Sequence, residues 1–119
     1  VLEQQIIGAG YNQPISSNDP SAHAEIVAIR QAAKALNNYR LINTTMYVTL
    51  EPCPMCAAAL LHARIKRLVY AASDPKTGAI GGAIDLYGSH NWNHTISCEA
   101  GLLAEPCSHL LREFFKQRR

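Results

Sequence analysis

The segment TTMYVTLEPCPMCAAALLHA, residues 44–63, sets the architecture of the chain. Residues 44–51 are rich in β-branched and aromatic side chains, which favours a buried strand. Pro52 cannot donate to a strand ladder, so the strand is expected to end there. Residues 55–63 predict a helix. A strand that passes directly into a helix is typical of layered α/β proteins.

Outward from this unit, strands and helices continue to alternate. Further strands are expected at Gln5–Gly10 and Arg67–Ala72. Residues Ile84–Thr95 favour neither a helix nor a strand, and two more helical pieces are expected between Cys98 and Phe115. Such alternation predicts an α/β fold whose strands are joined by parallel crossovers.

The helix before the central unit is expected to open at Asp19-Pro20. Asp19 or Ser21 can cap its first turn, where a proline is tolerated. Apolar residues then recur every three or four positions, as they do on a helix packed against a sheet. This stripe consists of Ala22, Ile26, Ile29, Ala33 and Leu36.

Length and composition indicate a single globular domain over residues 1–119, with 48% hydrophobic and 17% charged residues. No run approaches the ~20 apolar residues of a membrane span, and no stretch resembles a secretory h-region. Four cysteines without a disulfide-type pattern suggest the reducing cytoplasm. The net charge of +2 is too small to indicate nucleic-acid binding by itself.

Two short motifs carry the chemistry. His23-Ala24-Glu25 is followed by Cys53 and Cys56 in the sequence Pro-Cys-Pro-Met-Cys. One imidazole and two thiolates suit Zn²⁺, and three protein ligands leave a fourth position for water, as in catalytic zinc sites. Glu25 stands two residues from His23, where a carboxylate can take a proton from that water without being a ligand.

Other interpretations of these motifs are weaker. A CxxC pair alone also occurs in redox sites and structural zinc sites. A redox pair would not need His23 and Glu25, and a structural site would need a fourth ligand with its own spacing. Cys98 and Cys107 form no such unit and are expected to be small buried side chains. The combination therefore favours a catalytic zinc held by His23, Cys53 and Cys56.

The pattern H-x-E…P-C-x-x-C is the signature of zinc-dependent nucleobase deaminases. Beyond it, the chain resembles the bacterial tRNA-specific adenosine deaminase family (TadA) over essentially its whole length. The segments that carry this resemblance are Asn12–Ile15, Asp19–Glu25, Asn38–Leu41, Thr49–Cys53, Lys76–Ala79, Asn93-His94 and the basic Phe114–Arg119.

The resemblance implies a cytidine-deaminase-like three-layer αβα sandwich with a mixed central sheet. It also implies a homodimer. The chain begins at Val1, near the position of the family's first hairpin. We therefore expect the family's N-terminal helix and most of its first strand to be missing.

The implied activity is the deamination of adenosine to inosine at the wobble position of a tRNA anticodon, with Zn²⁺ as cofactor and an anticodon stem-loop as partner. Glu25 is the implied proton carrier, which protonates the ring nitrogen and then the departing amine.

Substrate contacts are also implied by the resemblance, and each has a structural alternative. Asn12 would read the base edge, or it forms a turn. Ala24, like Leu50 and Glu51, is expected to offer only backbone groups. Two further contacts are implied, the loop residues Asp74 and Lys76 and the pair Asn93-His94, whose alternatives are a solvated polar turn and an ordinary surface histidine.

Two other functions remain open on the residues alone. A free-base or nucleoside deaminase, of the cytosine or guanine type, shares the zinc signature. A non-catalytic zinc-stabilised RNA-binding module is disfavoured because Glu25 is present. The Lys-Thr-Gly loop at residues 76–78 and the basic tail favour RNA over a free base, although Lys116-Gln117 departs from the family's more arginine-rich pattern.

Overall fold

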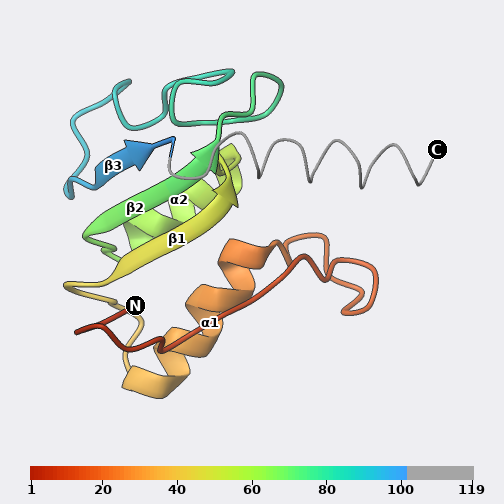
Figure 1. The fold of residues 1–119 in the computed structure, drawn as a ribbon, viewed down its shortest axis with the longest axis vertical. Coiled ribbons are helices and arrows are strands. Elements are labelled where there is room, and N and C mark those ends of the chain that lie inside the picture. The colour runs from red at the N-terminus through yellow and green to blue at the C-terminus, as the bar shows by residue number, and fades with distance from the viewer. Residues whose placement is uncertain (102–119) are drawn as a thin grey trace.

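The computed structural model describes residues 1–101 of the chain. Their helices and strands follow one another in the order α1 (Ala24–Leu36), β1 (Thr45–Leu50), α2 (Pro54–His62), β2 (Arg67–Ala72) and β3 (Ser97–Ala100) (Figure 1). The strands expected at Thr44–Glu51 and Arg67–Ala72 are confirmed, and so is the helix expected at residues 55–63. The alternation of strand and helix is therefore the one that the central segment predicts.

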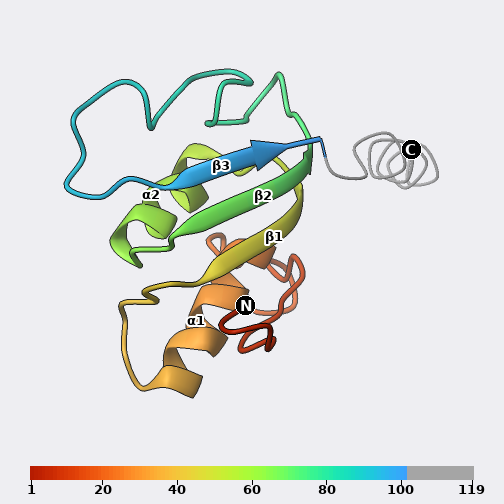
Figure 2. The same cartoon turned by 60° about the vertical axis from the view of Figure 1, so that its left-hand side comes forward.

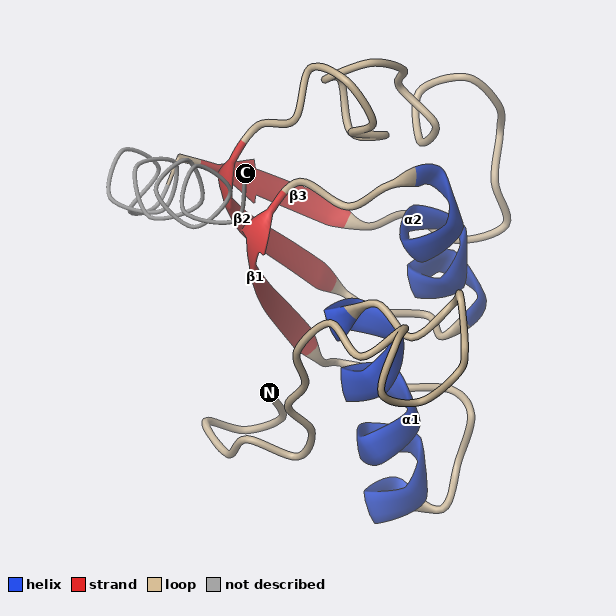
Figure 3. Ribbon diagram, turned by 90° about the vertical axis from the view of Figure 1, so that its right-hand side faces the viewer, coloured by secondary structure: helices blue, strands red, loops and turns tan. Residues whose placement is uncertain are grey.

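The three strands form a parallel sheet in the order β1-β2-β3. Helix α2 is the crossover between β1 and β2, as expected for parallel neighbours. Viewed along the sheet, α1 and α2 both lie on the same face (Figure 3). The carboxyl ends of β1 and β2 consequently lie at one edge, where ligands bind in open α/β sheets.

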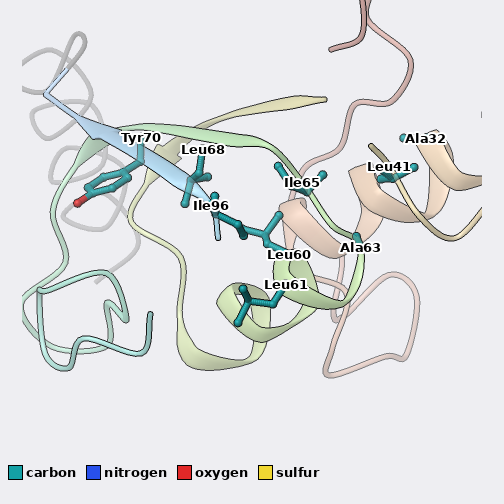
Figure 4. Close-up of a cluster of buried hydrophobic side chains, with 9 residues drawn as sticks. All are labelled: Ala32, Leu41, Leu60, Leu61, Ala63, Ile65, Leu68, Tyr70 and Ile96. Carbon is teal, nitrogen blue, oxygen red and sulfur yellow. The ribbon is translucent and has the colours of Figure 1, made fainter. Parts of the chain in front are cut away.

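The hydrophobic core lies between this face of the sheet and α2 (Figure 4). Leu60 of α2 and Leu68 of β2 are completely buried. Ile29, Ala33 and Leu36 of α1 pack against the same cluster, which confirms that part of the predicted apolar stripe. The buried members of the core cluster are Ala32, Leu41, Leu60, Leu61, Ala63, Ile65, Leu68, Tyr70 and Ile96.

Helix α1 starts later than the sequence predicts. The expected opening at Asp19-Pro20 is wrong, because α1 begins at Ala24 with His23 as its N-cap. The carboxylate of Asp19 accepts hydrogen bonds from the backbone N–H and the hydroxyl of Ser21, at 2.9 and 2.6 Å. These bonds hold a local turn, a common alternative to helix for aspartate.

The strand expected at Gln5–Gly10 is also wrong. Only an isolated bridge between Leu2 and Gln5 is present, and the following segment runs along α1 (Figure 1). A Cβ on Gly8 would collide with the carbonyl of Ala28, so glycine permits this close approach to the helix. The segment lies apart from the sheet, and a strand needs a neighbouring strand for its hydrogen bonds.

A groove separates this segment from β1. It has a volume of about 350 Å³, and its walls include Ile6–Gly10, the Ala24–Ala32 side of α1 and Thr45–Thr49 of β1. At one end of the groove, Val1 and Thr45 exchange two backbone hydrogen bonds of 2.8 and 2.9 Å. Among residues 1–101, β1 therefore has β2 on one side and only this single pair on the other.

The segment from Cys98 begins as a strand and not as a helix. Ser97–Ala100 forms β3, which lies beside β2 at one edge of the sheet (Figure 2). Pairing with β2, reinforced by two hydrogen bonds of 2.8 and 2.9 Å from Arg67 to Glu99, outweighs the local pattern. Cys98 is exposed, so its expected burial is wrong. The remaining predicted helical pieces, Cys107 and the basic tail lie outside the described residues.

No helix within residues 1–101 is both long enough and apolar enough to span a membrane.

Candidate active site

Three possible metal ligands meet where two helices begin. His23 is the N-cap of α1, and Cys53 is the N-cap of α2. Cys56 lies in the first turn of α2 and is completely buried. Pro52 ends β1 and Pro54 starts α2, so the chain turns sharply at the carboxyl edge of the sheet. The first turn of each helix therefore presents its side chains to one point at this edge.

The spacing of the ligand atoms fits a tetrahedral metal. Nδ1 of His23 lies 3.6 Å from Sγ of Cys53 and 3.5 Å from Sγ of Cys56. Ligands bound at roughly 2.0–2.3 Å in a tetrahedron lie about 3.5–3.8 Å apart. All three ligand atoms are within 4.8 Å of one another, and this trio is the only such group among the described residues. The predicted ligands His23, Cys53 and Cys56 are therefore brought together.

The environment of Cys56 also points to a cation. Burial raises the pKa of its thiol far above the usual range, and the nearby Glu25 and Cys53 raise it further. A thiol in such a position stays protonated unless a cation replaces the proton. Cys53 and Cys56 are both free thiols, so the structure shows no redox disulfide between them.

Glu25 lies in the first turn of α1, two residues after the N-cap His23. Its side chain is buried, with 9% of the residue exposed. After burial, the negative charge of Glu25 is the next largest cause of the raised pKa of Cys56, so its carboxylate lies near the ligand group. A buried carboxylate next to the ligands, yet outside the trio, has the placement expected of a proton carrier.

Asn12 contacts the same helix end. Its Oδ1 accepts a 2.8 Å hydrogen bond from the backbone N–H of Ala24. The amide nitrogen Nδ2 has no hydrogen-bond partner among residues 1–101 and could donate to a ligand. The contact also occupies the N–H of Ala24, which leaves Ala24 less to offer a substrate than the sequence suggests.

Asp74 organises the loop that follows β2. Its Oδ1 accepts hydrogen bonds from the backbone N–H groups of Lys76 and Thr77, at 3.0 and 3.2 Å, and its Oδ2 accepts one from the Thr77 hydroxyl at 2.7 Å. These bonds lower the pKa of Asp74. The carboxylate thus shapes a turn, the structural alternative considered for it. Lys76 is exposed, and its ammonium group has no ion-pair partner in the described part of the chain.

Asn93 and His94 are not brought to the metal ligands. Nε2 of His94 lies 2.7 Å from the carbonyl oxygen of Ile65, which fixes this imidazole to the main chain. Both residues line a separate cavity of about 300 Å³ at the carboxyl end of α2, the end opposite Cys53. The other residues around this cavity are Tyr39, Arg40, Ala58, Leu61, His62, Arg64 and Trp92.

The sequence-based reasoning missed the side chain of Glu51. It assigned only backbone groups to this residue, whereas the carboxylate is buried and bonded to the loop after β2. Its partners are 23 to 31 residues away, so no local motif reveals them.

The whole chain is similar to known deaminases. The family model of MafB19-like deaminases matches residues 1–119. The chain is 56% identical to the tRNA-specific adenosine deaminase of Haemophilus influenzae, over 98% of this chain and 67% of that protein. A solved structure from work on A-to-I editing by tRNA:A34 deaminases at the wobble position of transfer RNA superposes with a TM-score of 0.89 and 41% identity. The superposition covers 92% of this chain and 80% of the chain in the solved structure.

A second solved structure, of guanine deaminase from Nitrosomonas europaea, matches less well. Its TM-score is 0.71 at 29% identity, over 88% of this chain and 63% of that one. The α/β deaminase fold expected from the sequence is therefore confirmed.

Proposed function

This chain belongs to the MafB19-like deaminases, in the group of tRNA-specific adenosine deaminases, and from that premise we propose that it converts adenosine to inosine at the wobble position of a tRNA anticodon. Water and adenosine are consumed, and inosine and ammonia are formed. The observation that carries the proposal is the trio His23, Cys53 and Cys56 with the buried carboxylate of Glu25 beside it.

The metal is proposed to be Zn²⁺, held by His23, Cys53 and Cys56. When bound, Zn²⁺ lowers the pKa of a coordinated water to about 7 and so supplies a nucleophile at neutral pH. Metal analysis with X-ray absorption tests the assignment. One zinc with two sulfurs at ~2.3 Å is expected, whereas a third sulfur would indicate a closed structural site.

Side chains of the protein are proposed to transfer the protons and to bind the base. Glu25 takes a proton from the attacking water and delivers it to the ring nitrogen of adenine; it then transfers the proton of the new hydroxyl group to the amine, which departs as ammonia. Asn12, whose Oδ1 is held by Ala24, presents its free Nδ2 to an acceptor on the base edge. Because Asn12 is hydrogen-bonded to the end of α1 that carries Glu25, base and proton carrier are positioned together.

The substrate is proposed to be an anticodon stem-loop rather than a free base. The greater likeness to tRNA deaminases than to guanine deaminase supports RNA. Exposed Lys76, in the loop after β2, is the proposed phosphate contact, and Asn93 is a weaker candidate because it lies at the far end of α2. The Arg118-Arg119 tail is a further candidate.

One assay separates these functions. The zinc-loaded protein is incubated with an anticodon stem-loop, free adenosine, free guanine and free cytosine, and the products are separated by chromatography. Inosine formed in the stem-loop alone is expected. Deamination of a free base or nucleoside at a comparable rate would select the alternative enzyme class, and RNA binding without product would select a non-catalytic module.

Three broader assignments complete the proposal. Residues 1–119 form one deaminase domain, the enzyme acts in the cytoplasm, and it is a homodimer. Large apolar side chains on the described surface, such as Tyr11 and Tyr39, are compatible with a subunit interface. Light scattering coupled to size-exclusion chromatography measures the oligomeric state directly.

A further inference from the structure

Glu51 is the most buried charged residue in the described part of the chain, with 3% of its surface exposed. It directly follows β1 and precedes the Pro52-Cys53 segment. Its Oε1 accepts a hydrogen bond from the backbone N–H of Asp74 at 3.1 Å. Its Oε2 accepts two more, from Ile80 at 2.8 Å and Gly82 at 2.9 Å. Three backbone donors thus surround one carboxylate.

These donors explain how the charge is tolerated without a cation. A buried carboxylate is strongly unfavourable unless its oxygens are hydrogen-bonded. The loop is shaped to make these bonds, because a Cβ on Gly78 or Gly82 would collide with the carboxylate of Glu51. Two glycines and three N–H groups therefore converge on the side chain of Glu51.

The same region carries the metal ligands. The backbone N–H of Glu51 donates to Ala72 at 2.8 Å, and the carbonyl of Pro52 accepts from Ala79 at 2.8 Å. Glu51 and Pro52 therefore join the segment that ends in Cys53 to the loop of residues 74–82. At the start of this loop, Asp74 sets the turn that carries Lys76.

We propose that Glu51 is a positioning residue, which fixes the loop of residues 74–82 relative to the metal-ligand segment and so holds Lys76 in place for the substrate RNA. The inference rests on the proposed function, since it assumes that Lys76 contacts RNA. Glu51 itself touches neither the RNA nor the reacting atoms. Its contribution is to reduce the ordering that the loop must undergo when RNA binds.

The test compares Glu51→Gln with Glu99→Gln. A glutamine at position 51 has the same shape, but its amide would direct N–H groups at the backbone donors of the loop. Glu99 provides a matched carboxylate-to-amide change on β3, where it pairs with Arg67. Hydrogen exchange of the amides of Asp74, Ile80 and Gly82, metal content, and kinetics on a stem-loop RNA are measured for both variants.

For Glu51→Gln, we expect faster exchange at these three amides and one bound zinc. KM for the stem-loop should rise roughly five- to tenfold, the effect of one lost net hydrogen-bonding contact, with a smaller change in kcat. Glu99→Gln should change none of these quantities. Unchanged exchange in Glu51→Gln, faster exchange with an unchanged KM, or loss of zinc would overturn the proposal.

A double-mutant cycle with Lys76→Ala excludes a merely structural role. If Glu51 acts through Lys76, the double variant should raise KM little more than the larger single effect. Effects that multiply independently would overturn the proposal. If Glu51→Gln does not fold, Glu51→Asp replaces it, because the shorter side chain keeps the charge but withdraws the carboxylate from the N–H groups of Asp74, Ile80 and Gly82. A wild-type enzyme without activity on RNA would refute the proposed function itself, whereas independent effects in an active enzyme would refute only the role of Glu51.

Discussion

A substitution at Glu25 can separate the binding of zinc and RNA from the proton transfers of the reaction. It lies beside the ligand trio but is not a member of it. Glu25→Gln keeps the shape and removes the proton-accepting carboxylate. We expect turnover to fall by at least the 10²–10⁴-fold typical of one acid–base group, because Glu25 serves at two proton transfers. Zinc content and stem-loop affinity should stay near wild type, as measured by metal analysis and fluorescence anisotropy.

The matching control is His23→Ala, which should lose metal and activity together. A Glu25→Gln protein without zinc would show that Glu25 supports the metal site, and its role as proton carrier would then be refuted.

The carboxylate of Asp19 should make the stability of the folded protein depend on pH under acidic conditions. Hydrogen bonds from Ser21, and to a lesser extent from Arg30, lower its pKa to about 2. A carboxyl group with a lowered pKa in the folded state stabilises the fold above its unfolded pKa, about 4, and this contribution disappears as the pH falls towards 2. Asp19→Asn should therefore unfold at lower urea concentration than wild type at pH 6, and the difference should vanish near pH 2.

The size of this effect is limited because Asp19 is exposed to solvent screening. Arg30→Met should reproduce only a small part of it, since the Ser21 hydrogen bonds are the larger cause. An equal effect of the two substitutions would show that the ion pair with Arg30 dominates.

Among single residues, the sequence predicts the functional side chains that lie only a few positions apart in the chain. His23 and Glu25 are two residues apart, Cys53 and Cys56 three apart, and each pair is confirmed on its own helix end. Glu51 has no such signal. Its carboxylate is recognised only after the fold brings a loop from 31 residues away against it.

At the scale of helices, the end of α2 stores backbone strain. Arg64 follows the C-cap Ala63 with φ of 61°, a left-handed conformation that favours glycine. Arg64→Gly should stabilise the protein by about 0.5–1 kcal/mol, because a non-glycine residue is disfavoured there by roughly that amount. Urea denaturation measures the change.

The control is Asn37→Gly at the end of α1. Asn37 adopts a similar φ of 50°, but asparagine tolerates this conformation better than arginine does. Its replacement should therefore change stability by less than Arg64→Gly does. If Arg64→Gly is destabilising, the arginine side chain must make a contact whose value exceeds the strain.

Strands and helices could be predicted where a run of characteristic residues was long and ended at a clear boundary such as a proline. Thr45–Leu50 forms the strand expected at residues 44–51 because a β-branched run stops before Pro52, and Pro54–His62 forms the helix expected at residues 55–63. Gln5–Gly10 shows the limit of this reasoning. Its local composition favours a strand, but strand formation depends on a neighbour, and the segment lies against α1 instead.

For the whole molecule, the metal should contribute to folding. The ligands come from α1 and from the turn into α2, so one ion joins two helices on the same face of the sheet. Zinc that binds only the folded state stabilises it by about 4 kcal/mol when free metal is 1,000 times Kd. Adding zinc to the apoprotein should therefore raise Tm, as calorimetry can show, and His23→Ala should abolish most of that rise. An unchanged rise in the variant would mean that zinc binds elsewhere.

The pair formed by Val1 and Thr45 has a practical consequence for protein engineering. Because the backbone nitrogen of Val1 donates to the carbonyl oxygen of Thr45, residues joined to Val1 would leave from the open edge of β1. An affinity tag attached there would be directed along the groove, and an apolar one could pair with the strand itself. A tag rich in proline and charge would resist such pairing, so the choice of tag determines whether a purified sample keeps this edge open.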